Sequence, residues 1–151
     1  MDELDKMILR ELQANPTLSA EEISKRVGLS HTPCWRRIKK LEAENYILGR
    51  AVLLSPEKLN LNLTVFARIR LKQHDLATVE ALETAAQKCP EIVECYSMTG
   101  DADYICRVLV ADVAAYEDFL KKTILNFPGV GSVTSSVALK KIKLTTKIAV
   151  Q

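Results

Sequence analysis

The hydrophobic positions of the first fifty residues repeat at the period of a helix. Leu4, Ile8 and Leu12 stand four residues apart, which predicts a helix over residues 5–14 with one apolar face. Pro16 ends this helix, because the residue before a proline is driven out of the helical region. The chain is therefore expected to begin with a short amphipathic helix.

A second and a third helix follow with almost no linker between them. Residues 19–22, Ser-Ala-Glu-Glu, have the form of a capping box, in which the side chains of Ser19 and Glu22 each bind the other's backbone amide. Gly28 suits the left-handed residue that ends a helix, and the third helix is predicted over residues 30–44. Two helices joined by so short a turn are typical of a helix-turn-helix.

The third helix combines an apolar face with a basic one. Cys34, Ile38 and Leu41 fall on its inner side. Residues 25–40 hold six basic and no acidic residues, so the rest of a chain of net charge +2 sums to −4. A run of charge is commonly a solvated helix face, but on the second helix of a helix-turn-helix it favours DNA, since Lys and Arg neutralise phosphates and Arg can bind guanine in the major groove. The residues predicted to contact DNA are Ser30, His31, Thr32, Arg36, Arg37, Lys39, Lys40 and Arg50.

The segment after the third helix predicts a wing. Residues 46–54, YILGRAVLL, are expected to form two short strands about Gly49, with Arg50 placed to touch a phosphate. Residues 1–50 are thus interpreted as a winged helix-turn-helix domain, residues 51–62 as a linker strand and residues 63–151 as a second domain.

The second domain alternates strands with helices. Residues 63–71 place apolar side chains from Val65 to Leu71 on one side and Arg68 and Arg70 on the other, which predicts a strand. Further strands are expected at residues 92–98, 104–110 and 130–139, with a candidate at 142–150, and helices are expected to begin at Asp75 and Asp112.

This order, βαββαβ, contains an internal repeat at an offset of 38 residues, most visible where Cys89-Pro90 falls on Phe127-Pro128. Two such units predict a ferredoxin-like sheet with both helices on one face, so the whole chain is of the α+β class. Val65, Ile105 and Val137 are predicted to lie on an apolar face of the sheet that no helix covers. Because monomers rarely expose such a face, a homodimer that forms through this domain is expected.

Composition excludes several classes of protein. With 48% hydrophobic and 26% charged residues the chain is an ordinary globular one, and no apolar run reaches the length of a membrane span. Its acidic start is not expected to be a signal peptide, and the four cysteines, Cys34, Cys89, Cys95 and Cys106, match no zinc spacing. They are expected to be free thiols of a cytoplasmic protein, mostly in packing roles.

Six ordered motifs show that the chain resembles the Lrp/AsnC family of transcription regulators. They are L-D-x-x-I-L-x-x-L at 4–12, L-S-x-T-P-C-x-R-R-I-K-x-L-E at 29–42, L-L-S-P-E at 53–57, M-T-G-D-x-D-Y at 98–104, F-P-G-V at 127–130 and T-S-S-x-A-L-K-x-I-K at 134–143. The resemblance covers essentially the whole chain. It implies a winged helix-turn-helix, a C-terminal ligand-binding module (RAM-type) and dimers that assemble further, often to octameric rings that wrap DNA, as in nucleoid-associated proteins.

The resemblance also places an effector site at the loop of residues 99–104, TGDADY. Gly100 permits close backbone approach, exposed amides suit an α-carboxylate, and Asp101 or Asp103 suits an α-ammonium. Without the resemblance the loop would be interpreted as a solvated Gly-Asp turn. The residues implied to bind the effector are Met98, Thr99, Gly100, Asp101, Asp103, Tyr104, Thr134 and Ser136.

Two functions remain open at this point. The first is a sequence-specific, DNA-binding transcription regulator that responds to an amino acid or a related metabolite. The second is a chromosome-organising protein that binds duplex DNA without a ligand. An enzyme is not expected, because no nucleophile or metal cluster accompanies the two aspartates. No cofactor is expected apart from the amino-acid effector.

Overall fold

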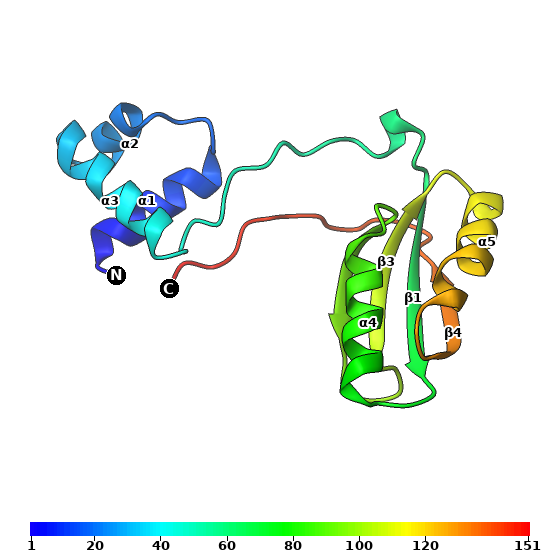
Figure 1. Cartoon of the computed structure of the whole chain (residues 1–151). Coiled ribbons are helices and arrows are strands. Elements are labelled where there is room, and N and C mark those ends of the chain that lie inside the picture. Colours follow the sequence, from blue (N-terminus) through cyan, green and yellow to red (C-terminus); the bar gives the residue numbers. More distant parts are fainter. The chain divides into compact units, whose positions relative to one another are not determined.

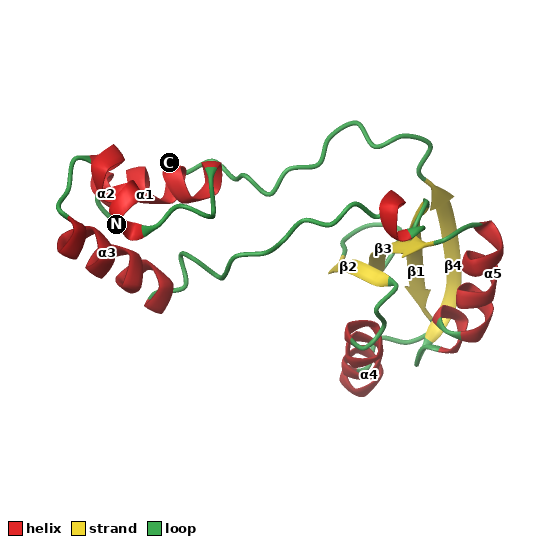
Figure 2. Ribbon diagram, turned by 90° about the horizontal axis from the view of Figure 1, so that it is seen from above, coloured by secondary structure: helices red, strands yellow, loops and turns green.

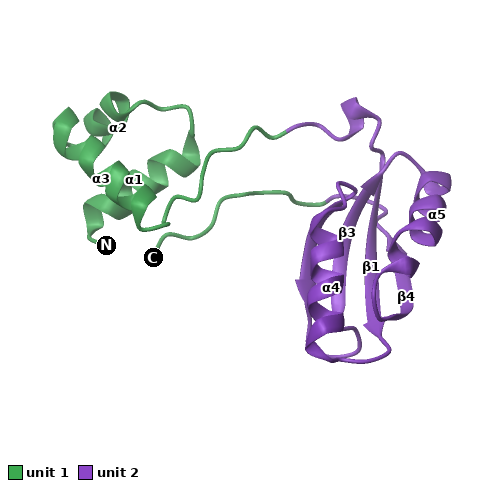
Figure 3. Cartoon of the chain, in the orientation of Figure 1, with its two compact units in different colours: residues 1–53, 142–151 green, residues 54–141 purple.

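The computed structural model describes residues 1–151 and divides them into two units (Figures 1 and 3). Unit 1 comprises Met1–Leu53 together with Ile142–Gln151, and unit 2 comprises Leu54–Lys141. None of the helices combines the length and the hydropathy that a membrane span requires. The units are described separately below.

Unit 1 is built on the three predicted helices, α1 (Glu3–Ala14), α2 (Ala20–Val27) and α3 (His31–Ala43). The capping box of Ser19 and Glu22 is confirmed, and Gly28 ends α2 in the left-handed region at φ 71°. Helix α1 starts two residues earlier than predicted, because Asp2 forms a second capping box with Asp5. One apolar cluster joins the helices: Ile8, Leu12, Leu18, Ile23, Val27, Cys34, Ile38 and Leu41.

The predicted wing strands are not formed. Residues 48–56 have no regular structure, and the last backbone bonds of this region run from Tyr46 and Ile47 back to the Leu41 carbonyl. The linker strand expected over 51–62 is likewise irregular except for a 3₁₀ turn at Glu57–Leu59. A ribbon of two such short strands has too few hydrogen bonds and too little buried surface to be stable without a further partner.

The end of the chain also departs from the prediction. Residues 142–150 form no strand, and Ile142–Gln151 belongs to unit 1 instead of the second domain. Its anchor is Gln13 on α1, whose amide nitrogen donates to the Ile148 carbonyl at 3.0 Å while its amide oxygen accepts from the Ile148 N–H at 2.7 Å. Arg10 adds a bond to the Val150 carbonyl at 3.2 Å. A side-chain amide thus binds the tail as a neighbouring strand would.

Unit 2 has the predicted ferredoxin-like βαββαβ order. Its elements are β1 (Leu63–Leu71), α4 (Leu76–Gln87), β2 (Ile92–Ser97), β3 (Tyr104–Val110), α5 (Val113–Lys122), a 3₁₀ turn at Ile124–Asn126, and β4 (Val130–Val137). The four strands are antiparallel neighbours in the order β2-β3-β1-β4, which can be followed in Figure 2. Asp75 and Asp112 cap α4 and α5 as predicted.

Both helices cover the same face of this sheet. Leu82 on α4 and Phe119 on α5 lie in one cluster with the buried residues of β1, which include Val65. Val137 is the cross-strand neighbour of Val65, so it shares the helix-covered face. Two of the three residues predicted for the helix-free face are therefore wrongly placed. Only Ile105 belongs there, because it alternates with the buried Tyr104 and Cys106 along β3.

Gly129 before β4 gives a prediction about stability. Its φ is 73°, and a Cβ atom there would lie 2.1 Å from Thr78 Cγ2 on α4. Gly129→Ala is expected to lower the free energy of unfolding by about 2–3 kcal/mol, because it adds backbone strain to a steric overlap. Urea unfolding measures this loss. Thr78→Ser in the same chain removes the offending methyl group and should recover part of it, whereas equal losses in both variants would show that the overlap is not the cause.

Candidate DNA-binding surface and effector pocket

Helix α3 presents its polar side to solvent as predicted. Cys34, Ile38 and Leu41 are buried against α1 and α2. The side chains of the outward face are exposed: His31, Thr32, Trp35, Arg36, Lys39 and Lys40. At the start of the helix Ser30 occupies the N-cap but makes no side-chain cap bond. The first backbone N–H groups of α3 are thus free to bind a phosphate.

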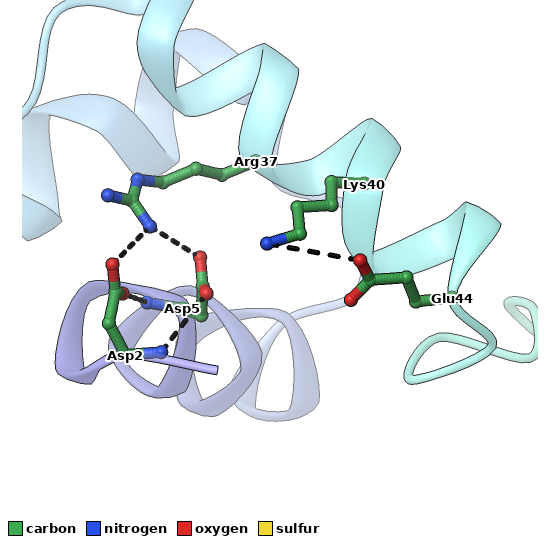
Figure 4. Close-up of polar contacts among 5 residues, drawn as sticks. All are labelled: Asp2, Asp5, Arg37, Lys40 and Glu44. Carbon is green, nitrogen blue, oxygen red and sulfur yellow. Dashed lines mark hydrogen bonds and ion pairs between the residues drawn. The ribbon is translucent and has the colours of Figure 1, made fainter.

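Arg37 points from α3 toward Asp2 and Asp5, whereas Lys40 of the same helix points toward Glu44 (Figure 4). Arg37 Nη1 donates to Asp2 Oδ2 and to Asp5 Oδ1, each at 2.7 Å. The side chain of Asp5 is only 4% exposed, so its carboxylate depends on Arg37 for charge compensation. The bonds to Asp5 and then to Asp2 raise the pKa of Arg37. In the protein without DNA, Arg37 therefore joins α3 to α1.

The remaining cations differ in how firmly they are held. Lys39 Nζ lies 2.7 Å from Glu42 Oε2, and Lys40 Nζ lies 3.9 Å from Glu44 Oε1. Such exposed pairs contribute little to stability, so a phosphate can replace the carboxylate at small cost. Arg36 is exposed and has no acidic partner. It is the cation of α3 that is most available to a ligand.

Two of the cations in the basic run, residues 25–40, are paired with carboxylates in the structure. Lys25 pairs with Glu21 at 2.8 Å, and Arg26 pairs with Glu11 on α1 at 2.9 Å. The first pair is visible in the sequence as an i, i+4 spacing, whereas the second depends on the packing of α1 beside α2. Arg50 is exposed in the irregular segment after α3, so no wing strand positions it.

Unit 2 contains a hollow at one end of its helix-free sheet face. The cavity has a volume of about 650 Å³ and is lined by Arg68, Arg70, Met98, Thr99, Asp101, Ala102, Ile105, Ser132 and Thr134. Four of the predicted effector residues are among them: Met98, Thr99, Asp101 and Thr134. The sequence pattern predicts that Arg68 and Arg70 lie opposite the core, but no motif assigns them to the site. The register of the strands determines which residues lie beside these arginines: Arg68 pairs with Ile105 on β3 and with Thr134 on β4.

The loop between β2 and β3 is held by charged groups of its own unit. Arg70 donates through Nε to the Asp101 carbonyl, and its Nη2 lies 3.6 Å from Asp101 Oδ1. Asp103 accepts from the Leu71 N–H at 2.7 Å and contacts His74 Nε2 at 2.8 Å. Both oxygens of Asp103 are thus occupied, while the Asp101 side chain is fully exposed at the cavity.

Four predicted effector residues lie outside the cavity lining. The Tyr104 side chain points to the helix-covered face, where its hydroxyl donates to Glu83 Oε1 at 2.8 Å. Burial and then that bond raise the pKa of Tyr104 to about 12. Ser136 pairs with Phe66 farther along the sheet, and Gly100 lies exposed in the loop at φ 101°. Asp103 has the bonding role just described.

Known families match both units. Residues 64–148 match the Lrp/AsnC ligand binding domain, and residues 1–47 match a winged helix-turn-helix DNA-binding domain.

The chain belongs to the Lrp/AsnC family.

Full-length relatives agree with this assignment. The DNA-binding transcriptional activator DecR of Escherichia coli K12 is 37% identical over 151 residues, which are 100% of this chain and 99% of DecR. The leucine-responsive regulatory protein of the same strain is 38% identical, covering 100% of this chain and 92% of that protein. This member of the Lrp/AsnC family is therefore a DNA-binding transcription regulator with a ligand-binding domain.

Solved structures of the Lrp/AsnC type show the same fold. A transcriptional regulator from Neisseria meningitidis, in complex with L-Met, has a TM-score of 0.93 at 38% identity and covers 99% of this chain and 96% of its own. An AsnC family regulator from Agrobacterium tumefaciens has a TM-score of 0.93 at 44% identity, covering 99% and 97%.

The bonds of Asp103 give this Lrp/AsnC protein a testable pH dependence. The Leu71 amide and then His74 hold the pKa of the Asp103 carboxyl below its ordinary value. The stability that this carboxylate contributes is complete above about pH 4, its pKa in an unfolded chain, and is lost as the pH falls through the lower folded-state pKa. Asp103→Asn is therefore expected to destabilise the protein at neutral pH and to cost progressively less in strong acid.

Urea unfolding from neutral pH into strong acid measures the free energy of unfolding of two proteins, of which one carries Asp103→Asn and the other does not. Both also carry His74→Ala, so that the bond from the Leu71 N–H is the one that acts on Asp103. A stability difference that grows on acidification would refute the predicted sign.

Proposed function

We propose that this protein binds operator DNA through α3 and that an amino acid bound in the cavity of unit 2 changes its affinity for DNA. The observation that carries the proposal is the placement of two arginines and one exposed aspartate around a single hollow, within the domain that matches ligand-binding modules. A zwitterion needs both charges at the site that binds it. Binding rather than catalysis is proposed, because both named relatives are transcription factors.

The polar groups of the cavity match the two ends of an amino acid. Arg68 is exposed and has no acidic partner, so its guanidinium is free to bind an α-carboxylate through two N–H groups. Arg70 is held by Asp101 and instead fixes the loop. The exposed Asp101 carboxylate is the acceptor proposed for the α-ammonium, and the hydroxyl of Thr134 is a further acceptor or donor.

The apolar part of the lining suggests the kind of side chain. Met98, Ala102 and Ile105 line the same cavity, so an unbranched or branched apolar side chain would be desolvated there. The related regulator from Neisseria meningitidis was solved with L-Met, which is such an amino acid. We propose an apolar amino acid, with methionine as the first candidate.

Self-association is part of the proposal. Eight large apolar side chains of two irregular segments are 63–98% exposed: Leu48, Val52, Leu53, Leu54, Leu139, Ile142, Leu144 and Ile148. Monomers seldom leave so much apolar surface in water, and a dimer would present two copies of α3 to two half-sites. We propose a homodimer with these segments in its interface. Light scattering of the full chain tests the dimer and its further assembly to an octamer, and a monomer at micromolar concentration would contradict it.

The ligand arm is tested with purified full-length protein and the twenty amino acids. An apolar amino acid is expected to raise the midpoint of thermal unfolding, because it binds the folded protein. It is also expected to change the affinity for a labelled duplex from the protein's own promoter, because a ligand that binds the free and the DNA-bound protein unequally must shift the equilibrium between them. No response to any amino acid, with DNA binding intact, would favour the ligand-independent chromosome-organising protein.

Arg68→Ala is the variant that assigns the pocket. It is expected to weaken the amino-acid response at least tenfold while the affinity for DNA without ligand stays unchanged, because a charged hydrogen-bond partner is lost only from the effector. Lys88→Ala, which removes an exposed charge outside the cavity lining, is the matched control and should respond as the wild type does. A normal response in Arg68→Ala would place the ligand elsewhere.

A further inference from the structure

Two cysteines face each other across neighbouring strands of unit 2. Cys95 on β2 and Cys106 on β3 are cross-strand partners, and their sulfur atoms are 3.0 Å apart, with the Cys106 thiol donating to Cys95 Sγ. Directly opposed residues of antiparallel strands have Cα atoms about 4.5–5.5 Å apart, which lies within the range that disulfides span. A covalent bond of about 2.05 Å thus requires the sulfurs to approach by about 1 Å more, without moving the strands.

The two thiols differ in access. Cys95 lines a cavity of about 320 Å³ between α4 and β2, beside Glu83 and Tyr104. Cys106 is fully buried. A small oxidant in solution can therefore reach Cys95 but not Cys106.

The hydrogen bond between the thiols also shifts their pKa values in opposite directions. The bond from Cys106 lowers the pKa of Cys95, although burial and the nearby Glu83 act in the opposite direction. The same bond, together with burial, raises the pKa of Cys106. Cys95 is thus the sulfur that more readily becomes a nucleophilic thiolate, and Cys106 is a protonated neighbour placed to react second.

We propose that Cys95 and Cys106 form a reversible disulfide when the protein meets a two-electron oxidant such as hydrogen peroxide. The Cys95 thiolate attacks one peroxide oxygen, the O–O bond breaks, and the departing hydroxide takes a proton to leave as water, which gives a sulfenic acid. Cys106 sulfur then attacks Cys95 sulfur, the S–O bond breaks, and the hydroxide leaves as water with the proton of Cys106. In sum, two thiols and one peroxide give one disulfide and two waters, and a dithiol reductant reverses the change.

The bond would close a short hairpin. Cys95 and Cys106 flank the loop Met98–Asp103, so the disulfide ties together the two strands from which that loop projects. The redox site itself does not depend on the function proposed above.

Thiol counting on the folded full chain tests the site. After exposure to hydrogen peroxide and removal of the excess, the protein is denatured and alkylated. The number of alkylated cysteines is expected to fall from four to two and to return to four after treatment with dithiothreitol. Cleavage after Glu94 and before Asp101 separates the two cysteines from each other and from Cys89, so peptides that remain joined and weigh two hydrogens less identify the bond.

Single replacements give the controls. Cys89→Ser should keep the disulfide, whereas Cys95→Ser should abolish it and leave the other three thiols free to alkylate. Cys95 lies on the exposed strand β2, so its replacement does not threaten folding as that of the buried Cys106 would. Four free thiols after peroxide, a bond that includes Cys89, or irreversible oxidation of Cys95 with Cys106 still free would each overturn the proposal.

Discussion

Replacing Arg36 and Lys40 together by alanine is expected to weaken binding to duplex DNA and to flatten its dependence on salt. Arg36 has no partner in the free protein, and Lys40 has only a loose one, 3.9 Å away. Neither side chain belongs to the core of unit 1, so the fold should be unchanged. The loss would therefore be one of contacts to DNA.

The size of the effect separates the two kinds of contact. Each lysine or arginine that neutralises a phosphate makes the slope of log affinity against log salt concentration more negative by about one unit, so losing two makes the slope less steep by about 2. If Arg36 instead binds a base edge, its removal costs about 1–3 kcal/mol and relaxes specificity at one position of the operator. Fluorescence anisotropy of a labelled duplex at several salt concentrations measures both.

The matched control removes the same charge from unit 2. Lys121 and Lys122 on α5 are exposed and pair with acidic residues one turn away, at Glu117 and Asp118. Their double replacement by alanine changes the net charge equally and should leave the slope unchanged. An unaltered slope in the α3 variant, or equal losses in the two variants, would mean that α3 does not face the phosphates.

Arg37→Ala is expected to lower the free energy of unfolding of unit 1 by about 2 kcal/mol, because it leaves the buried Asp5 carboxylate without its cation, while Arg37 itself is 31% exposed. Asp5 would then keep a carboxylate that is 4% exposed without a cation. Urea unfolding followed by the fluorescence of Trp35, the only tryptophan, reports this loss from α3 itself. Arg37→Ala combined with Asp5→Asn should recover part of it, since the buried charge is gone.

The same variant shows how Arg37 acts. If Arg37 holds α3 on α1, the folded Arg37→Ala protein should bind DNA nearly as the wild type does at low temperature. If the prediction from the sequence that Arg37 contacts DNA is right, affinity falls while stability hardly changes. A loss of less than about 1 kcal/mol would contradict the structural role, since that is the size of an ordinary surface pair.

Local sequence rules predicted the helices of unit 1 well, because their caps lie within three residues of the groups they bind. The partners of Arg37 could not be predicted in this way, since Asp2 and Asp5 meet it only after α1 and α3 have packed. The prediction of two wing strands is wrong for a related reason: a strand needs a partner strand to pair with, and an apolar pattern in the sequence does not supply one. The tail of the chain looked like a strand but is bound by Gln13 of the first helix.

In unit 2 the alternation of side chains along β1 is sufficient to predict which of its residues lie on which face of the sheet. Val65 has the parity of Ala67 and Ile69, so it could not serve both the core and the open face. The resemblance to Lrp/AsnC regulators predicts the position of the effector loop but not the residues that surround it. Arg68 and Arg70 enter the candidate site because β1 lies between β3 and β4, and that order is a property of the whole sheet.

The most direct measurement of the central claim uses Trp35, which lies on the outward side of α3 and is 48% exposed. Its emission is recorded while the full chain is titrated with promoter duplex in dilute buffer, with anisotropy of the labelled duplex as an independent report of binding. We expect both signals to saturate together, and added salt to reverse both. Binding that leaves the emission of Trp35 unaltered, or no binding even at low salt, would contradict the claim that α3 is the surface that contacts DNA.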